Sequence, residues 1–354
     1  MKIPKRTDYL AEYLAKNITS SKSTIAPTLL KGPEGCGKSW ITAILFQFLE
    51  KENSIIPVKI PYQLSGKNLV SNIISEIEIH EQEFIKNGTP LGEIRKKKIV
   101  LFVERIDQLF NLTGKEKQTH LPKVAKGRGA SQLTQTQHAA ELRSYLIERR
   151  DRVSLIATSE PDTRFMDDPD LPFFNFFTVI DVKPLSPDES RDFLISKISD
   201  SPKSQHTFRT LESFAVHASD ILTEGLISYV NLLASAILEV SEFSKKQKSE
   251  SKLIESTLAV YFNTISPAME SKILGLSYAE KSLMDRAIRL PYQFRVRDLK
   301  ITSTNESKVI LNLRQKGFLS PASPNSNLYY KISSSVFRAW LRYKVLKNTD
   351  EVFK

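Results

Sequence analysis

A glycine-rich loop near the N-terminus, GPEGCGKS at residues 32–39, limits the folds open to this chain. The segment before it, 23–32, has the apolar character of a strand, and the segment after it, 38–53, spaces its apolar residues as a helix does. The residues that fill the pattern G-x-x-x-x-G-K-[ST] are Gly32, Gly35, Gly37, Lys38 and Ser39. Strand, loop and helix in this order predict a phosphate-binding loop at the edge of a parallel sheet.

The loop also indicates a ligand. Glycines let backbone N–H groups turn inward around phosphates, and the N-terminus of the following helix adds its dipole. In such a loop Lys38 would reach the β and γ phosphates of ATP, and Ser39 would hold Mg²⁺. Cys36 stands at a variable position and is interpreted as incidental, with a reactive thiol as the alternative. The predicted nucleotide ligands are Gly32, Pro33, Glu34, Gly35, Cys36, Gly37, Lys38, Ser39 and Trp40.

Apolar strands and amphipathic helices continue to alternate after the loop. Strands are expected at 54–62, within 96–110, at 152–160 and at 176–186, and helices at 7–18, 65–79 and 136–150. Strands that are apolar on both faces and separated by helices are typical of a parallel sheet covered on both sides. Residues 1–185 are therefore predicted to be an α/β P-loop NTPase core, with a mobile basic loop at about 113–135.

A magnesium site beside the loop needs an acidic group at the tip of a neighbouring strand. Glu104 follows the apolar run KKIVLFV directly and is the candidate, with an ordinary strand-end acid as the alternative. The predicted metal ligands are therefore Ser39 and Glu104.

Beyond residue 185 the apolar periodicity is helical. Helices are expected at 187–198, 207–219 and 222–243, and residues 186–270 are predicted to form a helical lid. Residues 271–354 change pattern again, with helices at 277–289, 296–302 and 306–318, then a turn-rich ribbon and a final helix at 334–346. Helices followed by a β-ribbon predict a winged-helix domain.

The net charge of +11 is concentrated in that last domain. Residues 271–354 contain 16 Lys and Arg against 6 Asp and Glu. This asymmetry favours contact with duplex DNA, although a solvated basic face is the commoner meaning of a charge run, and the wing PASPNSN contains no Lys or Arg. The candidate DNA contacts are Arg295, Arg297, Lys308, Arg314 and Lys316.

Several classes of protein do not fit the composition. One cysteine cannot form an internal disulfide, and five scattered histidines do not indicate a zinc site. The N-terminus has no apolar signal core, and the most apolar later segment, 221–240, is interrupted by Glu224, Ser228 and Asn231. We therefore expect a cytoplasmic protein without a membrane partner.

The order of these elements resembles that of AAA+ ATPases of the origin-recognition type and of the related STAND-like ATPases of bacteria and archaea. The shared features are the glycine loop, the strand with an acidic tip, the strand SLIATSE with a polar tip, the helical lid and the winged helix. The segment from YFNTISPAME through GLSYAEKSLMDRAI and LRQKGFL to YYKISSSVFRAWL is similar to the end of the bacterial and archaeal members. The resemblance implies a nucleotide-driven switch that acts as a homo-oligomer or in a complex with an effector protein.

The resemblance also implies roles for single residues. Glu104 matches the magnesium-anchoring Asp, and Thr158 and Ser159 match the polar sensor of the γ phosphate. Arg105 stands where the family usually has its water-activating Glu, and a guanidinium cannot accept a proton from water. ATP binding is therefore expected together with slow, absent or partner-dependent hydrolysis. The predicted catalytic residues are Lys38, Glu104 and Ser159.

Two further positions depart from the family pattern. After Gly225 many relatives have a nucleotide-sensing arginine, but Ser228 stands in that region here. Arg164, shortly after the sensor strand, is a candidate arginine finger, with an ordinary surface arginine as the alternative.

Three functions remain open at this point. The winged helix could bind duplex DNA under the control of ATP, or it could dock a protein effector in a signalling ATPase, as in antiviral defence or transposon control. A metabolic NTPase or kinase is disfavoured because no substrate-pocket residues are evident. The apolar stripe Phe337, Trp340 and Leu341 could anchor a partner or could be the core of its own domain.

Overall fold

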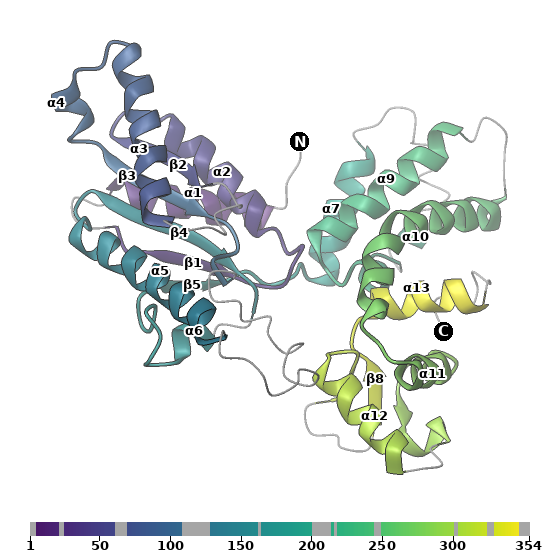
Figure 1. The fold of residues 1–354 in the computed structure, drawn as a ribbon. Coiled ribbons are helices and arrows are strands. Elements are labelled where there is room, and N and C mark those ends of the chain that lie inside the picture. The colour runs from purple at the N-terminus through teal and green to yellow at the C-terminus, as the bar shows by residue number, and fades with distance from the viewer. Residues whose placement is uncertain are drawn as a thin grey trace. The chain divides into compact units, whose positions relative to one another are not determined.

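The computed structural model describes residues 5–20, 25–60, 69–107, 128–161, 164–199, 214–215, 218–243, 249–300, 304–323 and 329–346. The chain divides into two compact units, one formed by Ile3–Lys183 and the other mainly by Pro184–Lys354. Figure 1 shows the elements of both units.

The first unit is built on a five-stranded parallel sheet with the order β2-β3-β4-β1-β5. Its strands are β1 (Thr28–Lys31), β2 (Ile55–Ile60), β3 (Lys98–Val103), β4 (Val153–Ser159) and β5 (Thr178–Asp181). β3 and β4 are almost entirely buried, as the central strands of a doubly covered sheet are. Strands β2, β3 and β4 lie on one side of β1, and β5 lies on the other, so the direction of the chain connections changes beside β1. In open parallel sheets, ligands bind at such a switch point, outside the carboxyl ends of the strands.

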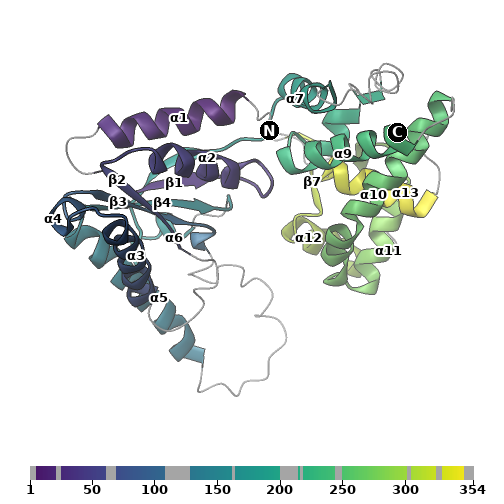
Figure 2. The ribbon, with the colours of Figure 1, turned by 90° about the horizontal axis from the view of Figure 1, so that it is seen from above.

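Helices cover both faces of this sheet (Figure 2). On one face α1 (Lys5–Ser20) packs on α2 (Lys38–Glu50), and on the other α3 (Leu69–Lys86) packs on α5 (Arg128–Glu148). The short helices α4 (Leu91–Ile94) and α6 (Arg164–Asp167) lie in connections. Buried Ile, Leu and Val side chains of β2, β3 and β4 form the main core with α3 and α5. The predicted α/β core is confirmed.

The predicted mobile loop at 113–135 is wrong in its last part. Residues 128–135 are helical and form the start of α5, so the helix expected at 136–150 begins earlier. Ser, Gln and Thr at these positions remove the apolar spacing that marks a helix, but they do not prevent a helical backbone. Residues 113–127 lie outside the described residues.

In the second unit α9 (Ile227–Phe243) packs against both α7 (Pro187–Ser199) and α10 (Glu250–Leu274). The single helix predicted over 222–243 is wrong, because Glu224 and Gly225 take positive φ angles of 51° and 69° and form a turn before α9. A Cβ atom at Gly225 would lie 2.1 Å from the carbonyl oxygen of Leu185, so this turn requires glycine.

The remaining elements of the second unit form a winged helix, as predicted. They are α11 (Tyr278–Ala287), β6 (Phe294–Arg295), the 3-10 helix η2 (Val296–Leu299), α12 (Thr304–Gln315), β7 (Leu319–Pro321), β8 (Tyr329–Ile332) and α13 (Ser335–Leu346). The three strands pair antiparallel in the order β6-β8-β7.

Helix α13 is tied to the turn before α9 and to α10 by side-chain hydrogen bonds. The Glu224 carboxylate accepts from the Val336 N–H and from the Ser335 hydroxyl, each at 3.2 Å, and so caps the N-terminus of α13. The Trp340 indole N–H donates to the Ser266 hydroxyl of α10 at 2.9 Å. Trp340 is only 2% exposed, and the whole stripe Phe337, Trp340 and Leu341 is buried. The stripe therefore belongs to the hydrophobic core of its own unit, and the alternative that it anchors a partner is wrong.

A buried acid stabilises the start of α11. Glu280 accepts hydrogen bonds from the Ser277 N–H at 2.7 Å and from the Lys316 ammonium at 2.9 Å. Burial opposes ionisation of Glu280, but the hydrogen bonds from Ser277 and the nearby Lys316 outweigh it and lower the pKa of the carboxyl. The charged form of Glu280 is therefore favoured in the folded state.

A pH-dependent loss of stability follows. Because the folded pKa is lowered, the stabilisation is complete above the unfolded pKa and disappears as the pH falls through the folded pKa. Glu280→Gln, which keeps the capping geometry, should lower the free energy of unfolding by about 1–2 kcal/mol at pH 7 and by much less near pH 3. Urea unfolding followed by Trp340 fluorescence in a Trp40→Phe background measures this difference. An equal difference at both pH values would contradict the role of the charge.

Candidate nucleotide site

The glycine loop forms a tight cradle between β1 and α2. Gly35 and Gly37 have φ angles of 82° and 103°, which favour glycine strongly. A Cβ atom at Gly32 would lie 2.2 Å from the carbonyl oxygen of Val182 and 2.9 Å from the Sγ atom of Cys36. Gly37 is the N-cap of α2 and provides no side-chain cap, so the positive end of the helix dipole faces the loop. These features fit the phosphates of a nucleotide.

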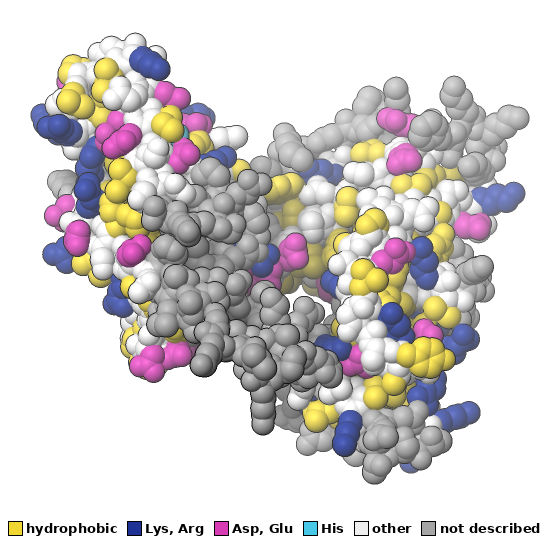
Figure 3. Space-filling view, in the orientation of Figure 1, with side chains coloured by type: hydrophobic (Ala, Val, Ile, Leu, Met, Phe, Trp, Pro, Cys, Tyr) yellow, Lys and Arg dark blue, Asp and Glu magenta, His cyan; other side chains and the backbone are white. Residues whose placement is uncertain are grey.

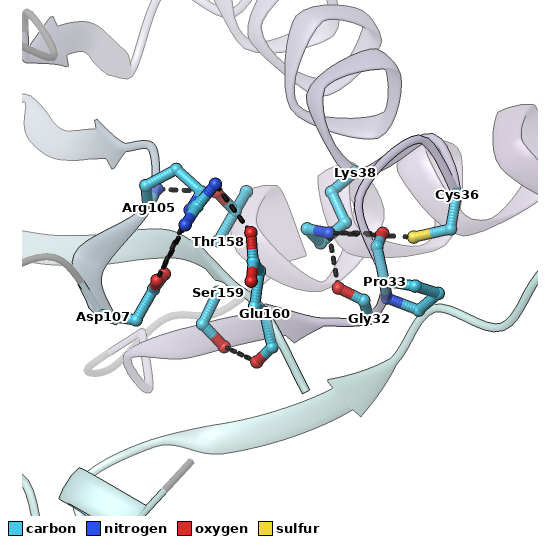
Figure 4. A network of polar contacts seen from close by, with 9 residues as sticks. All are labelled: Gly32, Pro33, Cys36, Lys38, Arg105, Asp107, Thr158, Ser159 and Glu160. Atoms are coloured by element: carbon cyan, nitrogen blue, oxygen red, sulfur yellow. Dashed lines mark hydrogen bonds and ion pairs between the residues drawn. The ribbon is translucent and has the colours of Figure 1, made fainter. Parts of the chain in front are cut away.

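The side chain of Lys38 lies inside this cradle (Figure 4). Its Nζ atom donates to the carbonyl oxygens of Gly32 at 2.6 Å and Pro33 at 2.7 Å, and it lies 3.8 Å from the Sγ atom of Cys36. The side chain is buried. Neutral carbonyl partners satisfy its donors but do not neutralise it, so the loop retains a net attraction for an anion.

Cys36 behaves as a packing residue. It is 2% exposed, and burial raises the pKa of its thiol, an effect that the neighbouring Lys38 only partly offsets. The thiol is therefore protonated at neutral pH and does not have the low-pKa character of a reactive cysteine.

The end of the sensor strand lies directly beside the loop. In the parallel pair β1–β4, Ser159 is level with Lys31, and the Gly32 N–H donates to the Ser159 carbonyl oxygen at 3.3 Å. Thr158 and Ser159 are both buried. The Ser159 hydroxyl donates to the carbonyl oxygen of Glu160 at 3.0 Å. The structure thus brings these two predicted sensor residues next to the predicted phosphate loop.

Arg105 lies at the tip of β3 and pairs with two acids (Figure 4). Its Nη1 atom is 2.7 Å from Oε1 of Glu160, and its Nη2 atom is 3.2 Å from Oδ2 of Asp107. The backbone of Arg105 is left-handed, with φ at 55°, and its N–H donates to the Thr158 Oγ1 atom at 2.9 Å. Left-handed backbone is uncommon for a residue other than glycine, so tertiary contacts hold it here.

Asp107 and Glu160 were not singled out from the sequence. Asp107 is 7% exposed, and its Oδ1 atom has no hydrogen-bond partner among the residues that the structure describes. A sequence signal existed, because a partly buried arginine needs counter-charges, and Asp107 lies in the predicted segment 96–110 while Glu160 is the last residue of the predicted strand 152–160.

The two predicted metal ligands both reach solvent. Ser39 lies in the first turn of α2 and Glu104 follows β3. Among the described residues no cluster of three or more His, Cys, Asp or Glu side chains could hold a metal ion. Mg²⁺ in nucleotide sites needs only one or two protein oxygens, because waters and phosphate oxygens complete its shell. A hydroxyl and a carboxylate therefore fit it.

The two positions that depart from the expected pattern, Ser228 and Arg164, lie in α9 and α6. Ser228 is exposed in the first turn of α9, two residues after the turn at Glu224 and Gly225 has ended. Arg164 is the first residue of α6, and its side chain lies outside the described structure. The role of Arg164 as an arginine finger stays a prediction.

Four of the five candidate DNA contacts have partners inside the winged helix, and in one of them the Nε atom of Arg297 lies 3.9 Å from Oδ1 of Asp298. Lys316 pairs with Glu280, and the guanidinium carbons of Arg295 and Arg314 lie 4.7 Å and 5.5 Å from the ring centres of Tyr329 and Tyr330.

Lys308 is exposed on α12, and the side chain of Arg297 is 74% exposed. On the face drawn in Figure 3, the Lys and Arg side chains of the second unit are mixed with apolar and acidic ones. The net charge of 271–354 is thus not gathered into one continuous basic face in this view.

Comparisons with known proteins give structural matches only. No family model and no curated protein matches the chain. The ORC1 protein of Aeropyrum pernix, solved in complex with DNA, is similar over 98% of this chain and 94% of its own, with 13% identity and a TM-score of 0.45.

Two further solved structures are similar over nearly their whole length. The ADP form of the Aeropyrum pernix ORC2 protein has 10% identity and a TM-score of 0.48, with 98% of this chain and 93% of its own covered. RuvB of Thermotoga maritima has 14% identity and a TM-score of 0.46, with 97% and 94% covered. We therefore base the function on the geometry of this chain's own residues. No helix among the described residues is long and apolar enough to cross a membrane.

Proposed function

We propose that this chain is an ATP-binding switch of the AAA+ or STAND-like type. The observation that supports it most directly is the loop itself. Gly35 and Gly37 hold a conformation that other residues take with difficulty, and the Lys38 ammonium lies inside the loop with neutral partners. Such a cradle at the carboxyl edge of a parallel sheet binds the phosphates of a nucleoside triphosphate.

Magnesium would complete the site. Ser39 and Glu104 are the residues that would hold it, and the ion would supply charge neutralisation for the β and γ phosphates. The residues of this chain would orient the triphosphate, through the loop N–H groups and Lys38.

Hydrolysis is proposed to be slow or dependent on a partner. The position at the tip of β3 that would activate water is Arg105, and its guanidinium is already paired with Asp107 and Glu160. A guanidinium has no acceptor for a proton, so it cannot serve as a general base. A switch that keeps its nucleotide for a long time suits control of assembly better than it suits repeated turnover.

The output of the switch is proposed to be assembly on duplex DNA through residues 271–354, as a homo-oligomer or with a protein partner. A second candidate is an effector-docking role for the same domain. It is favoured by the internal partners of Arg295, Arg314 and Lys316, and by two exposed apolar side chains, Leu274 and Tyr278, which are 80% and 89% exposed.

A single substitution separates these outputs. If α12 contacts DNA, Lys308→Ala should weaken duplex binding by the full chain about 3- to 10-fold and should reduce the slope of log affinity against log salt by about one. Lys252→Ala, an exposed lysine on α10 of the same unit, is the matched control and should leave affinity unchanged. The titrations are made with ATP and Mg²⁺ present, and mass and phosphate release are followed together.

Under the DNA proposal the mass of the DNA complex rises with ATP while little phosphate is released. Equal affinity of the wild type and Lys308→Ala at all salt concentrations would count against DNA contact by α12. A DNA-independent complex with an effector chain would support the second candidate.

A further inference from the structure

We infer that Arg105 is a ligand of the γ phosphate, and that Glu160 holds its outer nitrogen until ATP binds. This inference rests on the proposed ATP-binding function and adds to it a residue that makes the site prefer ATP to ADP. Under this inference Arg105, which replaces the water-activating acid, detects the γ phosphate.

The position of Arg105 supports this role. It follows β3, and its N–H is bonded to Thr158 at the end of β4. The end of β4 is in turn bonded to Gly32, the first residue of the loop, through the Ser159 carbonyl oxygen. One strand therefore separates Arg105 from the predicted phosphate cradle. In Figure 4 the side chains of Arg105 and Lys38 lie on either side of Glu160.

The guanidinium has two sides with different partners. Its Nε and Nη2 atoms are 3.4 Å and 3.2 Å from Oδ2 of Asp107, a carboxylate whose side chain is 9% exposed. Its Nη1 atom is 2.7 Å from Oε1 of Glu160, whose side chain is 36% exposed. The inner pair is thus buried, and the outer pair borders on solvent.

This asymmetry decides which pair can open. Separating Arg105 from Asp107 would leave a charge buried without its counter-ion, which is strongly unfavourable. Separating Arg105 from Glu160 releases a carboxylate that water can solvate, at little cost. Asp107 therefore acts as a positioning residue that keeps the guanidinium in place while its Nη1 atom changes partner.

The γ phosphate of ATP is a suitable replacement for the Glu160 carboxylate. Both are anionic oxygen acceptors, and phosphate oxygens accept charge-assisted bonds from arginine readily. ADP has no γ phosphate and leaves the Arg105–Glu160 pair closed. The Arg105–Glu160 pair would thus be open when ATP is bound and closed when ADP is bound. This difference would arise at the end of β4, the predicted sensor strand.

Two substitutions test the inference in opposite directions. Arg105→Gln removes the cation and should weaken binding of a non-hydrolysable ATP analogue about 10- to 100-fold, while ADP affinity changes less than about 2-fold. Glu160→Gln removes the competing carboxylate and should tighten binding of the analogue about 3-fold or more, again without effect on ADP. Calorimetric titration of the full chain with each nucleotide and Mg²⁺ gives the ratios.

The matched control is Arg152→Gln. Arg152 is a partly buried arginine of the same unit that pairs with Glu81 and precedes β4, so it stands at the opposite end of that strand. It should leave both affinities unchanged. The inference would be overturned if the wild type binds ATP but Arg105→Gln loses affinity for ATP and ADP equally, or loses affinity for neither. A wild type that binds neither nucleotide would instead overturn the proposed function.

Discussion

Replacing Arg105 by glutamate is expected to accelerate ATP hydrolysis. The substitution places a carboxylate at the tip of β3, where water would be activated, and general bases contribute about 100- to 10,000-fold in rate when they are well placed. This carboxylate is not supported by a shell of residues adapted to it, so we expect a gain of about 10-fold or more in phosphate release at saturating ATP.

The new carboxylate would stand beside Asp107 and Glu160, and like charges at such distances repel. The increase in the rate of phosphate release should therefore be larger in the double variant Arg105→Glu with Glu160→Gln, because it has one carboxylate fewer beside position 105. Arg105→Gln is the control, because it removes the cation without adding a base and should not release phosphate faster than the wild type does. Rapid phosphate release by the wild type itself would sink the idea that hydrolysis lacks a base.

Substitution of Lys38 by alanine is expected to abolish tight ATP binding. The ammonium would contact both the β and γ phosphates, and each charge-assisted bond contributes about 1.5–3 kcal/mol. Since about 1.4 kcal/mol corresponds to tenfold in affinity, the loss should exceed about 100-fold. Fluorescence titration with a labelled ATP analogue measures it.

Lys38 also bonds the carbonyl oxygens of Gly32 and Pro33, so its removal could loosen the loop. Ser39→Ala separates binding from loop stability. It should weaken ATP binding when Mg²⁺ is present and have little effect when Mg²⁺ is chelated. Lys51→Ala, an exposed lysine just after α2, is the charge control and should bind as the wild type does. Unchanged affinity in Lys38→Ala would mean that the nucleotide does not occupy the loop.

Local sequence patterns predicted the first unit well. Continuous apolar runs such as IVLFV, at 99–103, indicate a buried strand whatever their neighbours are, and the glycine loop fixes both the strand before it and the helix after it. The central parallel strands and the cradle around Lys38 follow from these local signals, because the positive φ angle of Gly37 falls on a glycine that the motif requires.

Features that depend on tertiary contacts were missed. The segment 222–243 has continuous apolar periodicity, and only the close approach of Gly225 to Leu185 explains why the chain turns there. The pairing of Arg105 with Asp107 and Glu160 joins the ends of two strands that are far apart in the sequence. Likewise, the net charge of 271–354 could not reveal that Lys316 is paired with the buried Glu280.

The most direct test of the whole account is a calorimetric titration of the wild-type chain with a slowly hydrolysed ATP analogue and Mg²⁺. We predict saturable heat with a stoichiometry of about one nucleotide per chain, as a single phosphate loop requires. No measurable heat across a concentration range that reaches the millimolar level would show that residues 32–39 do not hold a triphosphate, and the proposed switch would then be wrong.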